Sequence, residues 1–156
     1  IVETARGLAA VAELLAHPAV FLCAFGHLDF SLDIGASSEW ENLLCARSQL
    51  VFESRLAGVA APLDGVTLSF DDSDIVEKEA RRARNLGFGG KLLIHPRQVG
   101  PVFSVFRPSW DEYKWALKVL AVTADSHSVT KLDGMMIDTP VIKRAERIKQ
   151  DFESLS

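Results

Sequence analysis

Two acidic residues in this sequence stand where short apolar runs end. Glu3 follows the apolar residues 1–2, and Asp29 comes shortly after the apolar residues 20–25. In parallel α/β folds the loops beyond the carboxyl ends of the strands carry the chemistry, while the strands carry the packing. Glu3 and Asp29 could therefore share one ligand. Taken alone, Glu3 is equally well interpreted as an acid at a helix start, and Asp29 also fits a loop acid that bonds its own turn.

Two later apolar runs also end in polar residues, Asp64 after residues 59–63 and His95 within residues 91–96. Asp-Gly is a common turn signal, so Asp64 has two interpretations, a turn residue or a direct ligand contact. His95 precedes a proline, and we interpret it as a structural donor that shapes a pocket rather than as a general base. Both residues are candidates for the same edge of a sheet.

The elements that must position these side chains follow from apolar spacing. Helices are predicted at residues 4–17, from about 37 to 57, and at 74–86. The stretch 26–35 has glycine at both ends and is expected to be a loop, with Asp33 as a turn residue or a residue that leads into the next helix. Short apolar strands that alternate with helices predict βα units and a parallel sheet.

The last third of the sequence has a different pattern. Helices are predicted at residues 98–106 and 109–124, a short strand at 129–132, and a final helix with Thr139 as its N-cap and Pro140 in its first position. We therefore expect a domain of residues 1–106 and a helical extension of residues 107–156.

The composition limits the classes of function. The chain has 156 residues, of which 48% are hydrophobic, and a net charge of −4, which argues against a nucleic-acid partner. Cys23 lies in an apolar run and Cys45 in a helical pattern, so two reduced thiols are expected, as in a cytoplasmic enzyme. No apolar run approaches the roughly 20 residues that span a bilayer, so no membrane partner is expected.

Five motifs are spread over nearly the whole chain. They are Glu3-Thr4-Ala5-Arg6-Gly7, Phe25-Gly26-His27-Leu28-Asp29-Phe30, Pro62-Leu63-Asp64-Gly65-Val66, Gly90-Lys91-Leu92-Leu93-Ile94-His95-Pro96-Arg97-Gln98, and Leu132-Asp133-Gly134-Met135-Met136-Ile137-Asp138-Thr139-Pro140. In type and order they resemble the citrate lyase β-subunit-like branch of the HpcH/HpaI aldolase superfamily, which includes malyl-CoA and citramalyl-CoA lyases.

The resemblance implies a fold. That family folds as a (β/α)₈ TIM barrel of the phosphoenolpyruvate/pyruvate type, and the strands found here would be the last four of eight. Residues 1–106 would be the C-terminal half of the barrel, and residues 107–156 a helical extension that acts as a lid.

The resemblance also implies roles for particular residues. Glu3 and Asp29 would hold Mg²⁺ or Mn²⁺, which chelates a small α-keto acid. Asp138 would be the acid/base of the lid, often supplied by a neighbouring subunit, with Asp133 as the second choice. The residues that would contact the substrate are Gly26, His27, Leu28, Asp64, His95 and Pro96.

The function implied is a Mg²⁺-dependent carbon–carbon lyase. It would cleave or form a β-hydroxyacyl-CoA, such as malyl-CoA, citramalyl-CoA or a citryl thioester, with an α-keto acid and acetyl-CoA on the other side of the reaction. Alternatives are a class II aldolase for free hydroxy-keto acids, an acyl-CoA thioesterase, or a non-catalytic subunit. A homo-oligomer, trimer or hexamer, with exchanged lids is expected.

Overall fold

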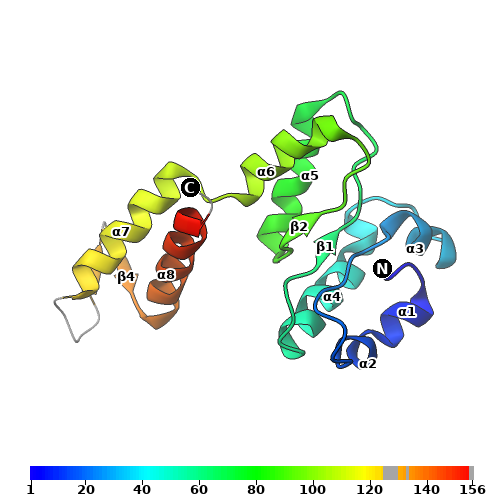
Figure 1. Cartoon of the computed structure of the whole chain (residues 1–156), viewed down its shortest axis with the longest axis horizontal. Helices are drawn as coiled ribbons and strands as arrows, with labels where there is room; N and C mark the ends of the chain where they lie inside the picture. The colour runs from blue at the N-terminus through cyan, green and yellow to red at the C-terminus, as the bar shows by residue number, and fades with distance from the viewer. Residues whose placement is uncertain (125–129, 133, 155–156) are drawn as a thin grey trace. The chain divides into compact units, whose positions relative to one another are not determined.

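The computed structural model describes residues 1–124, 130–132 and 134–154. These residues form two compact units, Ile1–Phe106 and Arg107–Ser156 (Figure 1). Each unit has its own hydrophobic core.

Short extended segments of the first unit pair in parallel. The segment around Val2 bridges to Phe25, and the residue before Phe25 bridges to the start of β1 (Leu63–Asp64). β1 in turn pairs in parallel with β2 (Gly90–Lys91). Every segment pairs with the next one along the chain and helices lie between them, which is the βα alternation that the sequence predicts.

The helix predicted at residues 4–17 is present as two short helices, α1 (Ala5–Ala9) and α2 (Val11–Leu15). The chain leaves helical geometry at Ala10, where φ is −93° and ψ is 4°. Thr4 caps α1, because its hydroxyl oxygen accepts a hydrogen bond from the backbone N–H of Gly7 at 3.0 Å. The break turns two side chains of α2 into the core.

The stretch 26–35 is not the loop that its glycines predict. It forms α3 (His27–Asp33), seven residues long, with Gly26 immediately before it. The prediction was wrong because the glycines flank the helix, while Phe30 packs into the main core at 4% exposure. Burial of this large aromatic side chain stabilises α3, although the local sequence does not predict a helix there.

The next helix begins later than predicted. A 3₁₀ turn, η1 (Glu41–Leu43), leads into α4 (Leu44–Leu56). Ser37 does not cap it, because the Ser37 hydroxyl instead accepts a hydrogen bond from the side-chain amide of Asn42 at 2.7 Å. The predicted end is confirmed: Gly58, with φ of 70°, follows the helix in the left-handed region.

The helix predicted at residues 74–86 is confirmed as α5 (Ser73–Leu86). Asp72 caps it by accepting hydrogen bonds from the backbone N–H groups of Asp74 and Ile75, at 3.0 and 3.1 Å. After β2, a 3₁₀ turn, η2 (Pro96–Gln98), leads into α6 (Val99–Phe106), and α5 and α6 share a small apolar cluster.

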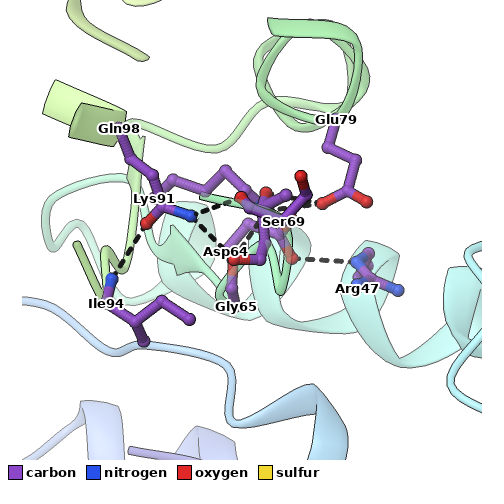
Figure 2. Close-up of polar contacts among 9 residues, drawn as sticks. Arg47, Asp64, Gly65, Ser69, Glu79, Lys91, Ile94 and Gln98 are labelled. Carbon is purple, nitrogen blue, oxygen red and sulfur yellow. Dashed lines mark hydrogen bonds and ion pairs between the residues drawn. The ribbon is translucent and has the colours of Figure 1, made fainter. Parts of the chain in front are cut away.

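β2 is shorter than the strand predicted at residues 91–96. The N–H of Leu92 still donates to the carbonyl of Asp64 at 2.8 Å, and beyond Leu92 the side chain of Gln98 takes the place of a neighbouring strand. Its oxygen accepts a hydrogen bond from the backbone N–H of Ile94 at 3.0 Å (Figure 2). It also accepts one from the backbone N–H of His95 at 3.3 Å. The chain therefore bends here instead of continuing in extended form.

The second unit packs two long helices with a hairpin. The helices are α7 (Trp110–Ala124) and α8 (Thr139–Ser154), and the hairpin joins β3 (Thr130–Leu132) to β4 (Met135–Ile137) in antiparallel pairing. The sequence predicts β3 but not β4. None of the helices in the described residues is both long and apolar enough to cross a membrane.

Candidate functional site

Glu3 and Asp29 line the same small pocket, about 140 Å³ in volume, at the carboxyl ends of the parallel segments. The rest of its lining is mainly apolar and comes from the ends of all four segments, namely Ile1, Phe25, Gly26, His27, Leu28, Val66 and Leu92. The two acids thus line one pocket, and their sharing of one ligand stays a prediction.

Backbone pairing sets the position of Glu3. The N–H of Val2 donates to the carbonyl of Ala24 at 2.8 Å, and the N–H of Gly26 donates to the carbonyl of Val2 at 2.9 Å. The side chain of Glu3 then lies directly against Gly26, so that a β-carbon at position 26 would overlap it. Glycine is required there because the acid approaches the backbone closely.

Asp29 is held by α3. It lies in the first turn of this helix and is exposed, while Phe30 beside it is buried. Because successive residues of a helix point about 100° apart, the burial of Phe30 determines which way Asp29 faces.

His27 forms a wall shared by this pocket and a second one. Its ring is buried at 8% exposure and lies against Gly65, where a β-carbon would overlap the imidazole. Burial lowers the pKa of His27, and the nearby guanidinium of Arg47 lowers it further, although Asp64 acts in the opposite direction. The imidazole is therefore a neutral surface at neutral pH.

The second pocket, about 210 Å³, adjoins a cluster of buried charges. The two oxygens of Asp64 accept hydrogen bonds from Arg47 Nε at 2.8 Å and from Lys91 Nζ at 3.2 Å (Figure 2). Lys91 also donates to the carbonyl oxygen of Gly65 at 2.6 Å and lies 3.6 Å from Glu79. The side chains of Arg47, Asp64 and Lys91 are at most 4% exposed.

This cluster clamps the loop that follows β1. Cations from α4 and β2 both hold Asp64, while the hydroxyl of Thr67 donates to Glu79 of α5 at 2.6 Å. Arg47 also stacks over the ring of Trp40, with its guanidinium carbon 4.2 Å from the ring centroid. Asp64 lines the second pocket with both oxygens engaged, and its predicted contact with a ligand stays a prediction.

His95 and Pro96 lie at the start of η2, and neither lines the two pockets described. The Nδ1 atom of His95 accepts a hydrogen bond from the backbone N–H of Arg97 at 3.2 Å, and its ring stacks on Phe70 at a centroid distance of 4.9 Å. In this structure Nδ1 of His95 is an acceptor and not the donor that the sequence predicts, and binding of the substrate by these two residues stays a prediction.

Asp138 belongs to the second unit and is exposed. It caps α8, because its carboxylate accepts a hydrogen bond from the backbone N–H of Val141 at 3.2 Å. Thr139 was predicted for this role, but it is already the first helical residue. Asp133, the second choice for a lid acid, lies outside the described residues.

The donor set of the smaller pocket fits a magnesium ion that the substrate helps to hold. Within residues 1–124, 130–132 and 134–154 no group of three or more His, Cys, Asp or Glu side chains is placed to hold a metal. Mg²⁺ does not need one, because it keeps several waters and commonly binds through one or two carboxylates together with the substrate.

Sequence reasoning missed the buried cations. Arg47 and Lys91 look like an ordinary helix residue and an ordinary strand residue, and lysine and arginine are rarely fully buried without a partner. The available signal was Asp64 itself, because an acid at the end of a buried strand requires a cation nearby.

Parallel βα segments with paired carboxylates at their carboxyl ends define an α/β protein with a candidate metal site. The HpcH/HpaI aldolase/citrate lyase family model matches residues 1–96. The mitochondrial citramalyl-CoA lyase of Mus musculus is 36% identical over 162 residues, covering 94% of this chain and 48% of that protein. The citrate lyase subunit beta-like protein of Deinococcus radiodurans is 33% identical over 152 residues, covering 94% of this chain and 53% of that protein.

Solved structures agree with these relatives. The crystal structure of Mycobacterium tuberculosis CitE in complex with magnesium, acetoacetate and coenzyme A superposes with a TM-score of 0.86 at 29% identity, covering 96% of this chain and 58% of that chain. The chain belongs to the HpcH/HpaI aldolase/citrate lyase family, and the resemblance drawn from the five motifs is confirmed. The chain spans about half the length of the curated relatives that it matches.

Proposed function

We propose that this chain supplies the metal-binding part of a Mg²⁺-dependent carbon–carbon lyase acting on a β-hydroxyacyl-CoA such as malyl-CoA, citramalyl-CoA or a citryl thioester. The observation that carries the proposal is the pocket shared by Glu3 and Asp29. Membership of the family, the lyase names of the relatives, and a similar structure that holds magnesium and coenzyme A support it.

In this proposal Glu3 and Asp29 hold Mg²⁺, or Mn²⁺ in its place, by their carboxylate oxygens. When bound, the ion polarises the carbonyl of an α-keto acid as a Lewis acid. Leu28 and the neutral ring of His27 limit access of water and give the keto acid an uncharged wall. We propose that the keto acid occupies this pocket, of about 140 Å³, and that the rest of the thioester lies outside it.

Asp138 is proposed as the acid/base that moves a proton at the α-carbon of the acyl-CoA. Its exposure supports the role, because a carboxylate that reaches a substrate must be accessible. Gly26, His27 and Leu28 are proposed to contact the keto acid, and His95 with Pro96 to contact the acyl-CoA.

At the level of the fold, we propose that residues 1–106 are the last four βα units of a (β/α)₈ barrel and that residues 107–156 are its lid. A closed barrel of this type needs about 200 residues or more. We also propose a cytoplasmic homo-oligomer, trimer or hexamer, in which lids are exchanged.

The test is an assay of the complete protein with Mg²⁺ and either citramalyl-CoA or malyl-CoA as the substrate. Cleavage is measured as release of the keto acid and of acetyl-CoA. Asp29→Asn should lower kcat/KM by at least about 100-fold and weaken metal binding, because it removes one of two charged ligands. Asp71→Asn, a change at an exposed acid in the loop before α5, should have no effect. If Asp29→Asn leaves both metal affinity and turnover unchanged, the proposal fails.

The same assay separates the alternatives. Cleavage of free hydroxy-keto acids, without a need for CoA, identifies a class II aldolase. Release of CoA with the carbon skeleton intact identifies a thioesterase, and intact metal binding without turnover of any of these compounds identifies a non-catalytic subunit.

A further inference from the structure

Asp33 makes a side-chain bond between the two segments that carry Glu3 and Asp29. Its Oδ2 atom accepts a hydrogen bond from the backbone N–H of Ala5 at 2.7 Å. Ala5 is the first residue of α1, two positions after Glu3, and Asp33 is the last residue of α3, four positions after Asp29. Residues four apart share one face of a helix, so Asp29 and Asp33 lie on the same side of α3.

The buried contacts of α3 lie in its first five residues. It is seven residues long and buries His27, Phe30 and Ser31, whereas Leu32 near its end is exposed. The bond from Asp33 adds a contact at the C-terminal end of α3 and fixes that end against the start of α1. The bond to Ala5 is well suited to this, because it is charge-assisted and its acceptor lies at the N-terminus of α1, where the helix dipole favours a negative charge.

We propose that Asp33 is a positioning residue for the metal pocket, which holds the Asp29 face of α3 at a fixed distance from Glu3 by its bond to the α1 backbone. The inference rests on the proposed metal-binding role of Glu3 and Asp29. Asp33 itself does not line the pocket and is not a ligand in this scheme.

The test uses Mn²⁺ as the probe and the complete protein, with binding measured by titration calorimetry. Asp33→Ala should weaken Mn²⁺ binding about tenfold, the lower end of the range for groups that orient metal ligands. In kinetic assays the metal concentration for half-maximal activity should rise, while kcat at saturating Mn²⁺ stays near that of the wild type. Asp33→Asn should retain most of the affinity, because its amide oxygen can still accept the bond from Ala5.

Asp72→Ala is the matched control. It removes a carboxylate that likewise accepts hydrogen bonds from helix N–H groups, those of Asp74 and Ile75, but at the start of α5. It should lower stability as much as Asp33→Ala does and leave Mn²⁺ affinity unchanged.

Two results would overturn the inference alone: unchanged Mn²⁺ binding by Asp33→Ala, or a loss in Asp33→Asn as large as in Asp33→Ala, which would indicate a through-space charge effect. A wild-type protein that binds no Mn²⁺ would overturn the proposed metal site, and this inference with it.

Discussion

At the scale of single residues, two glycines let side chains of the candidate site lie against the backbone. Glu3 occupies the space beside Gly26, and His27 the space beside Gly65. Both glycines follow apolar runs in the sequence, where they look like turn residues. Glycine is needed at both positions because a side chain of the pocket wall approaches the backbone closely there. Any β-carbon would displace that side chain.

The buried charges around Asp64 predict an effect on stability. Asp64→Asn should lower the free energy of unfolding by about 3–5 kcal/mol, because Arg47 would remain buried without a counter-charge and Lys91 would keep only Glu79, 3.6 Å away. Chemical denaturation measures the change. Asp111→Asn removes the acid of an ion pair with Lys114 that is 2.8 Å long and largely exposed, and should have a far smaller effect. Equal losses in the two variants would show that burial does not govern the Asp64 cluster.

Residue types at strand ends were sufficient to predict the two acids of the pocket, but not what surrounds them. Glu3 and Asp29 can be identified as candidates from the sequence because each follows an apolar run. Asp33 was interpreted as a turn residue, because its partner is a backbone N–H 28 positions away, and no local pattern records such a bond. Arg47 and Lys91 were missed for the same reason.

At the scale of elements, the helices of eight or more residues were predictable, although α4 begins later than predicted, whereas the shorter α1, α2 and α3 were not. α5 has strong apolar periodicity and a capping acid, so its bounds follow from the sequence within one residue. α3 has seven residues and depends on Phe30 meeting a core built from other segments. The end of β2 was also not predicted. The backbone N–H groups of Ile94 and His95 are bound there by the side chain of Gln98 and not by a neighbouring strand.

The contact between α7 and α8 can be tested through the absorbance of one tyrosine side chain. Tyr113, the only tyrosine of the chain, donates a hydrogen bond from its hydroxyl to Glu153 at 3.0 Å. This bond raises the pKa of Tyr113 because it favours the protonated form. Ultraviolet titration should therefore show phenolate forming above the pH expected for a free tyrosine, and Glu153→Ala should lower the midpoint.

The sign of the coupling to stability follows from the raised pKa. The contribution of the Tyr113 bond is fully present below the pKa of an unfolded tyrosine, and it is lost as the pH rises through the folded value. Unchanged midpoints in Glu153→Ala would show that the bond is not formed in solution.

At the scale of the whole molecule, the proposed lid exchange can be tested by mixing two inactive variants of the complete protein. Asp29→Asn removes one of the two proposed metal ligands, and Asp138→Ser removes the proposed lid acid but keeps a good N-cap for α8. If each lid serves a neighbouring subunit, a mixed oligomer contains some sites with both residues intact. Activity should then reappear after the subunits are allowed to exchange, whereas a lid that serves its own subunit gives no recovery.

The parallel segments end in two edges that are not alike. At β2 the amide of Gln98 occupies the backbone N–H groups of Ile94 and His95, so that side has a side-chain guard against pairing with another strand. At the other side Val2 exchanges hydrogen bonds with residues 24 and 26, and Ile1 beside it is 75% exposed. The N–H groups of Ile94 and His95, already engaged by the side chain of Gln98, therefore cannot donate to a further strand.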